Sequence, residues 1–146
     1  MPPVTIRTTA REGFAPVYAS AGAAGADLRA CIGDPVVLKP GERLPVPTGV
    51  HIELPDGYEA QIRPRSGLAL RSGITLINSP GTVDSDYRGE IICPLINLGN
   101  EPFRIEPGMR IAQMVIGHVS KAEFELVQNL APSSRGSNGF GSTGVH

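Results

Sequence analysis

Residues 50–63 read VHIELPDGYEAQIR, with apolar side chains at every second position of 50–54 and again of 58–62. The Pro-Asp-Gly triplet at 55–57 separates the two runs. Such alternation places successive side chains on opposite faces of a β-strand, and Pro, Asp and Gly are typical of turns. The stretch therefore predicts a β-hairpin with the same alternation on both of its strands.

Two runs further along the chain, residues 91–96 and 111–116, are apolar at almost every position. Such runs are expected of strands that are covered on both faces, by a second layer or by another subunit. Each of the segments 40–43 and 107–110 has the pattern Pro-Gly-x-Arg and precedes a strand-like run. We interpret the two segments as recurrent turns rather than as an internal repeat.

Glycine and proline indicate many short strands. The 18 glycines and 14 prolines fall singly between apolar runs. No segment has the long 3.6-residue periodicity of a capped helix, so we expect at most one short helix, near residues 66–71. Short strands with Gly/Pro turns predict a single all-β domain over residues 1–131, as a sandwich, barrel or jelly roll. Residues 132–146 are rich in Gly and Ser and predict a flexible arm.

Composition limits the classes of function. The 13 basic and 14 acidic side chains give a formal net charge of -1, so we expect no nucleic-acid partner. We expect no secretory signal, and no run is long enough to cross a membrane. Cys31 and Cys93 lie far apart among apolar or small neighbours, and we interpret them as buried free thiols of a cytoplasmic protein. The three histidines lack ligand spacing, so a protein-built zinc or copper site is not expected.

The segment with the most specific chemistry spans residues 78–91 and reads NSPGTVDSDYRGEI. Its glycines allow a tight hairpin that holds Asp84 at the end of a strand. An aspartate is ionised at pH 7 and can take a proton from a water molecule that attacks phosphorus. Taken alone, Asp84 is as readily a turn residue, and Tyr87 a core or interface aromatic. We interpret Asp86 as a turn-forming residue rather than as half of a catalytic pair.

Four further segments place polar side chains beside glycine, where the backbone can approach a ligand closely. They read AGADLRA at 24–30, RPRSGLAL at 63–70, GMRIAQMVI at 108–116 and RGSNGFGSTG at 135–144. Each also has an ordinary interpretation. Asp27 can bind backbone N–H groups at a strand start, Arg65 can be a solvated arginine, and Gln113 can bind a neighbouring backbone. The last segment alone is a linker with one stray aromatic.

In order and spacing, the five segments together resemble the five motifs of the homotrimeric dUTP diphosphatase (dUTPase) family. The resemblance extends from Ala24 into the C-terminal tail, with Ala69 where some relatives have glycine. It implies a compact jelly roll or distorted β-barrel, of the dUTPase-like β-clip type, and a homotrimer with sites shared between subunits. It also implies hydrolysis of dUTP to dUMP and pyrophosphate, which keeps uracil out of DNA and supplies dUMP for thymidylate synthesis.

The same resemblance implies a mechanism. Water attacks the α-phosphorus with Asp84 as the general base, while Mg²⁺ spans the three phosphates and keeps waters in its shell. We therefore expect no direct protein ligand to the metal. Asp27 would reach it through a water or orient a basic partner near the phosphates.

The resemblance further implies three groups of substrate-binding residues. The base and sugar readers are Asn78, Thr82, Val83, Tyr87 and Ile92. They act mainly through the backbone of the hairpin, with the tyrosine ring packed on the deoxyribose. The phosphate contacts are Arg65, Ser66, Gly67 and Gln113. The arm supplies a ring to stack on uracil, an arginine for the γ-phosphate and two hydroxyl donors, which are Phe140, Arg135, Ser142 and Thr143.

Two other functions fit parts of the same pattern. A dCTP deaminase shares the expected fold and handles a similar nucleotide, and it would release ammonia from dCTP. A catalytically silent nucleotide-sensing module would bind dUTP without releasing pyrophosphate. Asp84, Tyr87 and the Arg/Phe arm favour the diphosphatase.

Overall fold

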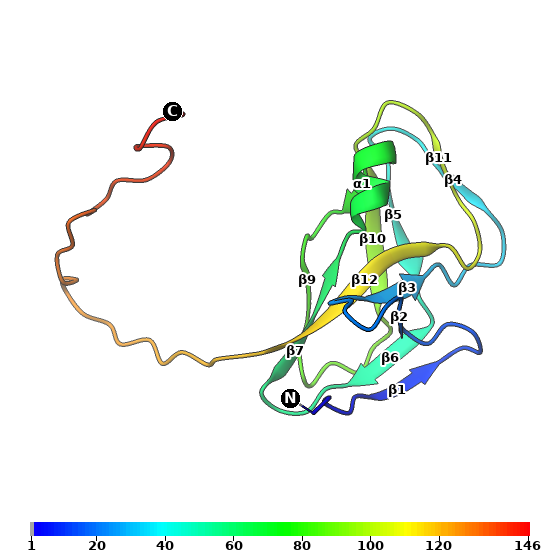
Figure 1. Ribbon diagram of the computed structural model, residues 1–146, viewed down its shortest axis with the longest axis horizontal. Helices are drawn as coiled ribbons and strands as arrows, with labels where there is room; N and C mark the ends of the chain where they lie inside the picture. The colour runs from blue at the N-terminus through cyan, green and yellow to red at the C-terminus, as the bar shows by residue number, and fades with distance from the viewer. Residues whose placement is uncertain (1) are drawn as a thin grey trace.

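The computed structural model describes residues 2–146 (Figure 1). Within that range, short strands and one helix alternate with turns. The strands are β1 (Arg7–Ala10), β2 (Val17–Tyr18), β3 (Ala26–Arg29), β4 (Val36–Leu38), β5 (Arg43–Pro47), β6 (Val50–Glu53), β7 (Tyr58–Arg63), β8 (Ile74–Leu76), β9 (Gly81–Val83), β10 (Ile92–Asn97), β11 (Phe103–Ile105) and β12 (Arg110–His118). The helix is α1 (Ser66–Ser72). The expected all-β fold with one short helix is confirmed.

The strands form antiparallel ladders that do not close into a barrel within residues 2–146. The largest ladder has the order β2-β3-β12-β7-β9, and a second has the order β5-β10-β8. Two smaller ladders pair β1 with β6 and β4 with β11. The result is a jelly-roll-like body in which β12 lies between β3 and β7 (Figure 1).

The predicted hairpin at residues 50–63 is wrong in its pairing, although both of its strands exist. β6 pairs with β1, whereas β7 pairs with β12 and β9. The turn between them is closed by the Tyr58 N–H, which donates to the Pro55 carbonyl at 3.2 Å, and Gly57 has φ 85°. A positive φ at the third residue is typical of a type II turn, whose twist splays the flanking strands. The chain therefore turns a corner into another ladder.

The core takes its side chains from alternate strand positions. Its largest fully buried apolar members are Leu28, Leu38, Val46, Val50, Ile74, Leu95, Ile105 and Ile111. In β10 the side chains of Cys93 and Leu95 point into this core, whereas Ile92 is 49% exposed. The apolar run at residues 91–96 is therefore covered on one face by its own chain, and its other face is partly open.

The two cysteines lie in different surroundings. Cys93 is buried in β10, and burial raises the pKa of its thiol to about 12, so it stays protonated near neutral pH. Cys31 is partly exposed, and its Sγ lies 3.7 Å from Arg11 Nη1. The expectation that both thiols are buried is wrong for Cys31, because β3 ends at Arg29 and Cys31 lies beyond it in a surface connection.

Helix α1 follows β7 directly and begins one residue after Arg65. It ends at Ser72 and is capped by Gly73, which has φ 68° and where a β-carbon would collide with the backbone of Gly99. The two predicted Pro-Gly turns precede β5 and β12, and Gly41 and Gly108 both have positive φ. These turns set the positions at which β5 and β12 begin.

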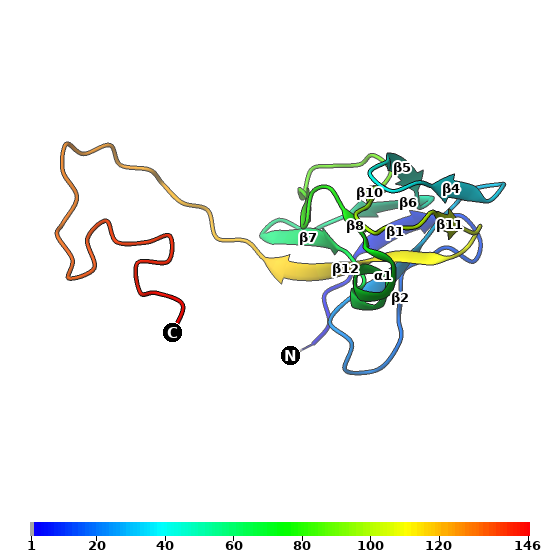
Figure 2. The ribbon, with the colours of Figure 1, turned by 90° about the horizontal axis from the view of Figure 1, so that it is seen from above.

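The C-terminal segment leaves the body where β12 ends at His118. The Val119 N–H donates to the Gly57 carbonyl at 2.9 Å. Residues 119–146 then run away from the ladders without helix or strand (Figure 2). Among the described residues, no helix is long and apolar enough to span a membrane.

Candidate active site

Strand register brings three of the five motif segments together. Across the ladder β3-β12-β7, Gln113 is opposite Asp27 on one side and opposite Arg63 on the other. The segment that carries Arg65 follows β7 immediately. Residues far apart in sequence thus meet at one end of three neighbouring strands.

The Asp27 carboxylate lies between two arginines. Its Oδ1 is 3.5 Å from Arg65 Nε, and its Oδ2 is 3.3 Å from Arg110 Nη1. The Asp27 side chain is 12% exposed, whereas the two arginines are more open. We call Asp27, Arg65, Arg110 and Gln113 the strand-end cluster. The sequence predicted a metal-bound water or a basic partner for Asp27 and did not single out Arg110, although Arg110 stands in the quoted segment 108–116.

Gln113 is satisfied by the backbone, as its ordinary interpretation allowed. Its Nε2 donates to the Pro64 carbonyl at 3.0 Å. Its Oε1 lies over Gly25, where any β-carbon would collide with the amide. Gly25 is therefore needed for this side-chain position. The bond to Pro64 also fixes the start of the Arg65–Gly67 segment.

Ser66 and Gly67 form the first turn of α1, and the Arg71 side chain folds back over Gly67. A β-carbon at Gly67 would lie 2.8 Å from Arg71 Nη2. Arg71, on the last turn of the helix, is a second arginine that sequence reasoning missed. Arg65 and Arg110 contact the Asp27 carboxylate, and Arg71 lies beside Gly67, so this region has more positive than negative side chains, which suits a small polyanion.

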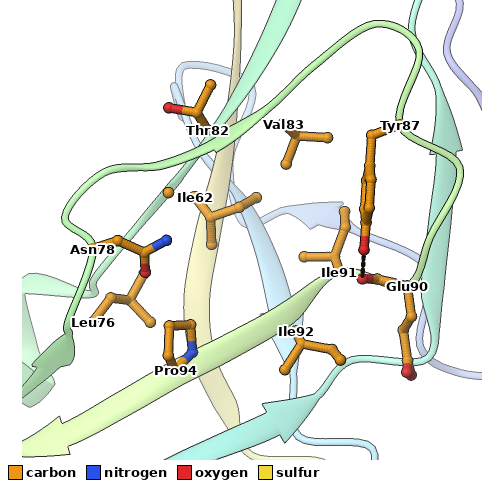
Figure 3. Close-up of a pocket in the computed structure, with 11 residues that line it drawn as sticks. Ile62, Leu76, Asn78, Thr82, Val83, Tyr87, Glu90, Ile91, Ile92 and Pro94 are labelled. Carbon is orange, nitrogen blue, oxygen red and sulfur yellow. Dashed lines mark hydrogen bonds between the residues drawn. The ribbon is translucent and has the colours of Figure 1, made fainter.

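A pocket of about 160 Å³ lies between β9 and β10 (Figure 3). Its lining comprises Ile62, Leu76, Asn78, Gly81, Thr82, Val83, Tyr87, Glu90, Ile91, Ile92 and Pro94. All five predicted base and sugar readers are in this set, and none of the strand-end cluster is. Drug-sized ligands fill pockets of roughly 300–1,000 Å³, so this one holds a part of a ligand the size of a single ring.

The predicted hairpin at residues 78–91 is wrong as a ladder. β9 pairs with β7, whereas β10 pairs with β5 and β8. β9 is the edge strand of its sheet, so its second edge faces the pocket without a strand partner among the described residues. Edge strands present unpaired N–H and C=O groups. The gap between β9 and β10 therefore exposes backbone groups to a ligand.

Tyr87 lies along one wall of this pocket. Its hydroxyl donates to the Glu90 carbonyl at 2.8 Å, as Figure 3 shows. A β-carbon at Gly89 would collide with the hydroxyl and the ring. The hydrogen bond and the bare glycine together set the orientation of the ring.

Asp84 follows directly after β9 and is exposed. The Tyr87 N–H donates to the Asp84 carbonyl at 3.2 Å, and Asp86 lies in the turn that this bond closes. The carboxylate borders a different depression, which is also lined by Tyr58, Glu59 and Lys121. In one chain, Asp84 is thus adjacent in sequence to the pocket strand but is not part of the pocket lining.

The arm residues lie apart from both groups. Arg135 Nε donates to the Asn138 carbonyl at 2.7 Å, which is a contact within the arm. Phe140 is fully exposed and has φ 50°, and Ser142 and Thr143 are exposed as well. Figure 1 shows the arm far from the body that carries the pocket.

Known proteins resemble this chain over nearly its whole length. A family model described as dUTPase matches residues 11–144. The deoxyuridine 5'-triphosphate nucleotidohydrolase of Chlamydia pneumoniae is 59% identical over 134 residues, which cover 91% of this chain and 92% of that protein. The protein of the same name from Roseobacter denitrificans is 61% identical over 130 residues, covering 88% and 86%.

A solved structure agrees with these relatives. The dUTPase of Staphylococcus bacteriophage 80alpha with dUPNHPP has a TM-score of 0.84 and 26% identity, over 97% of this chain and 99% of that one. The fold and these similarities define an all-β hydrolase of a deoxynucleoside triphosphate. The chain belongs to the dUTPase family. It is a dUTP diphosphatase, which hydrolyses a phosphoric anhydride, and the deaminase interpretation is set aside on this ground.

Proposed function

We propose that this enzyme converts dUTP to dUMP and pyrophosphate by water attack on the α-phosphorus, with Asp84 as the general base. The observation that carries the proposal is the position of Asp84 directly after β9. The free edge of β9 borders the pocket, so a ligand bound to that edge lies close to the following residue. The Asp84 carboxylate is exposed and free to meet a water molecule.

Uracil binds in the pocket between β9 and β10 through the backbone of Thr82, Val83 and Ile92. The Asn78 amide lies across the pocket and assists (Figure 3). Buried donors and acceptors that cytosine leaves unmatched would discriminate strongly between the two bases. The Tyr87 ring packs on the deoxyribose face where a ribose would carry its 2′-hydroxyl, and so disfavours ribonucleotides.

The triphosphate binds at the strand-end cluster and the first turn of α1. Arg65 supplies a planar fork of donors, and Ser66, Gly67 and Gln113 supply a hydroxyl, a backbone N–H and an amide. The Asp27 carboxylate holds Arg65 and Arg110 side by side at 3.5 and 3.3 Å. Oxygen atoms of the ligand would take the remaining donors of both arginines.

Magnesium fits this donor set through a bridging water rather than through a direct protein ligand. Among the described residues, no three His, Cys, Asp or Glu side chains gather to hold a metal ion. The Asp27 oxygens face two arginines but keep lone pairs for a water molecule. Mg²⁺ keeps several waters and binds through substrate phosphates, and it neutralises phosphate charge when bound. Asp27 would therefore reach it through a water.

A homotrimer with shared sites would cover residues that are exposed in the single chain. Arg135 and Phe140 are far from the pocket of their own body, and Ile92 on β10 is half exposed (Figure 1). In a trimer, the arm would bring the Phe140 ring to uracil and the Arg135 guanidinium to the γ-phosphate of another subunit, with Ser142 and Thr143 as hydroxyl donors. The same proposal assigns residues 1–131 to the domain and residues 132–146 to the arm with the fifth motif, although the chain already leaves the strands after His118.

We also propose the cellular role. Hydrolysis of dUTP keeps uracil out of DNA, and the dUMP released supplies thymidylate synthesis. Both cysteines are free thiols, which supports a location in the reducing cytoplasm. The partner is the small-molecule substrate rather than a nucleic acid or a membrane.

Pyrophosphate release from dUTP, dCTP, dTTP and UTP tests the proposal, in wild type and in Asp84→Asn. Asp86→Asn is the matched control, because it makes the same change in the same turn. We expect activity on dUTP alone, and a loss in kcat of about 10²–10⁴ for Asp84→Asn that Asp86→Asn does not share. Full activity of Asp84→Asn would refute the assignment of the base, and binding of dUTP without pyrophosphate would favour the silent module.

A further inference from the structure

Residues 84–91, which we call the β9–β10 loop, connect two strands that do not pair with each other. A loop without a ladder between its flanking strands has to be held by other contacts if its side chains are to be placed accurately. The loop carries both Asp84 and Tyr87. The contacts that hold it are therefore candidates for a role in the reaction.

The Arg88 guanidinium supplies the inner contacts. Its Nη1 donates to the Ser85 carbonyl at 2.6 Å and to the Tyr87 carbonyl at 3.1 Å. These are charge-assisted hydrogen bonds, which are about twice as strong as neutral ones. They join the two residues that flank Asp86 in the turn after Asp84. One side chain thus fixes the spacing between the Asp84 end and the Tyr87 end of the turn.

Arg88 also fastens this turn to the neighbouring strand β6. Its Nη2 lies 3.7 Å from Glu53 Oε1, and its own carbonyl lies 2.9 Å from Nδ1 of His51. Glu53 and His51 are on β6, which is paired with β1 along its length. The turn is therefore connected through one residue to a regular part of the sheet.

We propose that Arg88 is a positioning residue, which holds the turn so that Asp84 and Tyr87 keep their places relative to the β9 pocket. The proposal rests on the roles proposed above for Asp84 and Tyr87. Arg88 itself points its guanidinium into the turn and toward β6, away from the role of a ligand contact. Its effect is to limit the conformations that the two site residues adopt, and a small misplacement can cost about 10²-fold in rate.

Arg7 provides a matched control for the surface charge pair. It lies on β1 opposite Glu53, and its Nη1 is 3.1 Å from Glu53 Oε2. Arg7 and Arg88 thus share one carboxylate, but the bonds to Ser85 and Tyr87 belong to Arg88. Exposed ion pairs contribute little by themselves, so loss of the Glu53 pair alone should leave the turn in place.

The test compares Arg88→Met with Arg7→Met, since methionine keeps the apolar stem and removes the guanidinium. Because the Arg88 side chain is 53% exposed, we expect melting temperatures within about 4 °C of wild type. For Arg88→Met we expect kcat on dUTP to fall by about 10–100-fold and the preference for dUTP over UTP to fall about tenfold. Arg7→Met should keep both values, and Arg88→Lys should recover part of the loss, because an ammonium reaches one carbonyl.

Asp84→Asn is assayed in parallel to separate two failures. If Asp84→Asn is inactive while Arg88→Met matches Arg7→Met in kcat and in dUTP preference, the positioning role is wrong and the base assignment stands. If Asp84→Asn keeps its activity, the proposed base fails and the role of Arg88 fails with it. A fall in melting temperature that accounts for the lost rate, with unchanged dUTP preference, would also overturn the proposal.

Discussion

The strand-end cluster and the C-terminal arm carry parts of the same proposed site. The cluster is fixed by strand pairing and burial, whereas the arm is exposed. Asp27 and Gln113 lie on paired strands, and Asp27 contacts two arginines in a largely buried position. Arg135 and Phe140 lie in an exposed segment that contacts itself. Burial and strand pairing fix the first group before a ligand arrives, whereas the role proposed for the second requires the arm to become ordered on binding.

This difference indicates that the two regions act at different steps of the reaction. A preorganised group binds a ligand without a further loss of conformational entropy. An arm that orders on binding contributes at a later step, when it can exclude water and neutralise charge. The body should then determine folding and initial binding, and the arm should mainly affect turnover.

Of the three changes, removal of the arm should cause the largest loss of activity. A protein of residues 1–134 lacks Arg135 and Phe140, and arginines that neutralise a phosphoryl group can contribute 10³ or more. We expect kcat to fall by about 10³ with an unchanged melting temperature, because the arm hydrogen-bonds to itself. Steady-state kinetics and thermal unfolding measure both, with loss of only Val145 and His146 as the control. Unchanged turnover would remove the arm from the site.

Breaking the strand-end cluster should have an intermediate effect. Asp27→Asn removes the charge that holds Arg65 and Arg110 together in a site where Asp27 is 12% exposed. We expect kcat/KM to fall by about 10–100-fold, since the two arginines lose their common partner. Glu106→Gln is the control, because its pair with Arg104 is far more exposed. Equal small effects of the two substitutions would show that burial of Asp27 gives it no special role.

Gly25→Ala should have the smallest effect of the three. The new methyl group would collide with the Gln113 amide and push it from the Pro64 carbonyl. We expect about a tenfold loss in kcat/KM and a lower melting temperature. Gly22→Ala is the matched control, because nothing lies within 4 Å of a β-carbon there. A Gly25→Ala enzyme that matches Gly22→Ala would show that the position of Gln113 does not matter.

Local features of the fold could be predicted from the sequence, but pairing could not. The alternation in residues 50–63 correctly predicted that β6 and β7 are strands. The Pro-Gly turns before β5 and β12 were also predicted correctly. Alternation reports which face of a strand is buried, not which strand lies beside it. The partner of β6 is β1, whose side chains are all exposed and show no alternation. The hairpin assignments failed for that reason.

The same limit applies to predicting the site residues from the sequence. Predicted residues that are neighbours on one strand, such as Thr82 and Val83, line one pocket. Arg110 was missed because its contact with Asp27 spans 83 positions in sequence and depends on the register of β3 with β12. The roles given to the predicted residues stay predictions. In the proposed trimer, Asp84 and Phe140 of different subunits meet, a contact that the sequence and structure of one chain do not contain.

The central claim is that the body of one subunit and the arm of another complete each site, and mixed trimers test it most directly. Full-length Asp84→Asn carries an arm without the base, and residues 1–134 carry the base without an arm. The two proteins are unfolded and refolded together in equal amounts, and pyrophosphate release from dUTP is measured against each protein alone. The account predicts that about a quarter of the sites regain activity, since each active site then combines the two chains. A mixture as inactive as its components would contradict it.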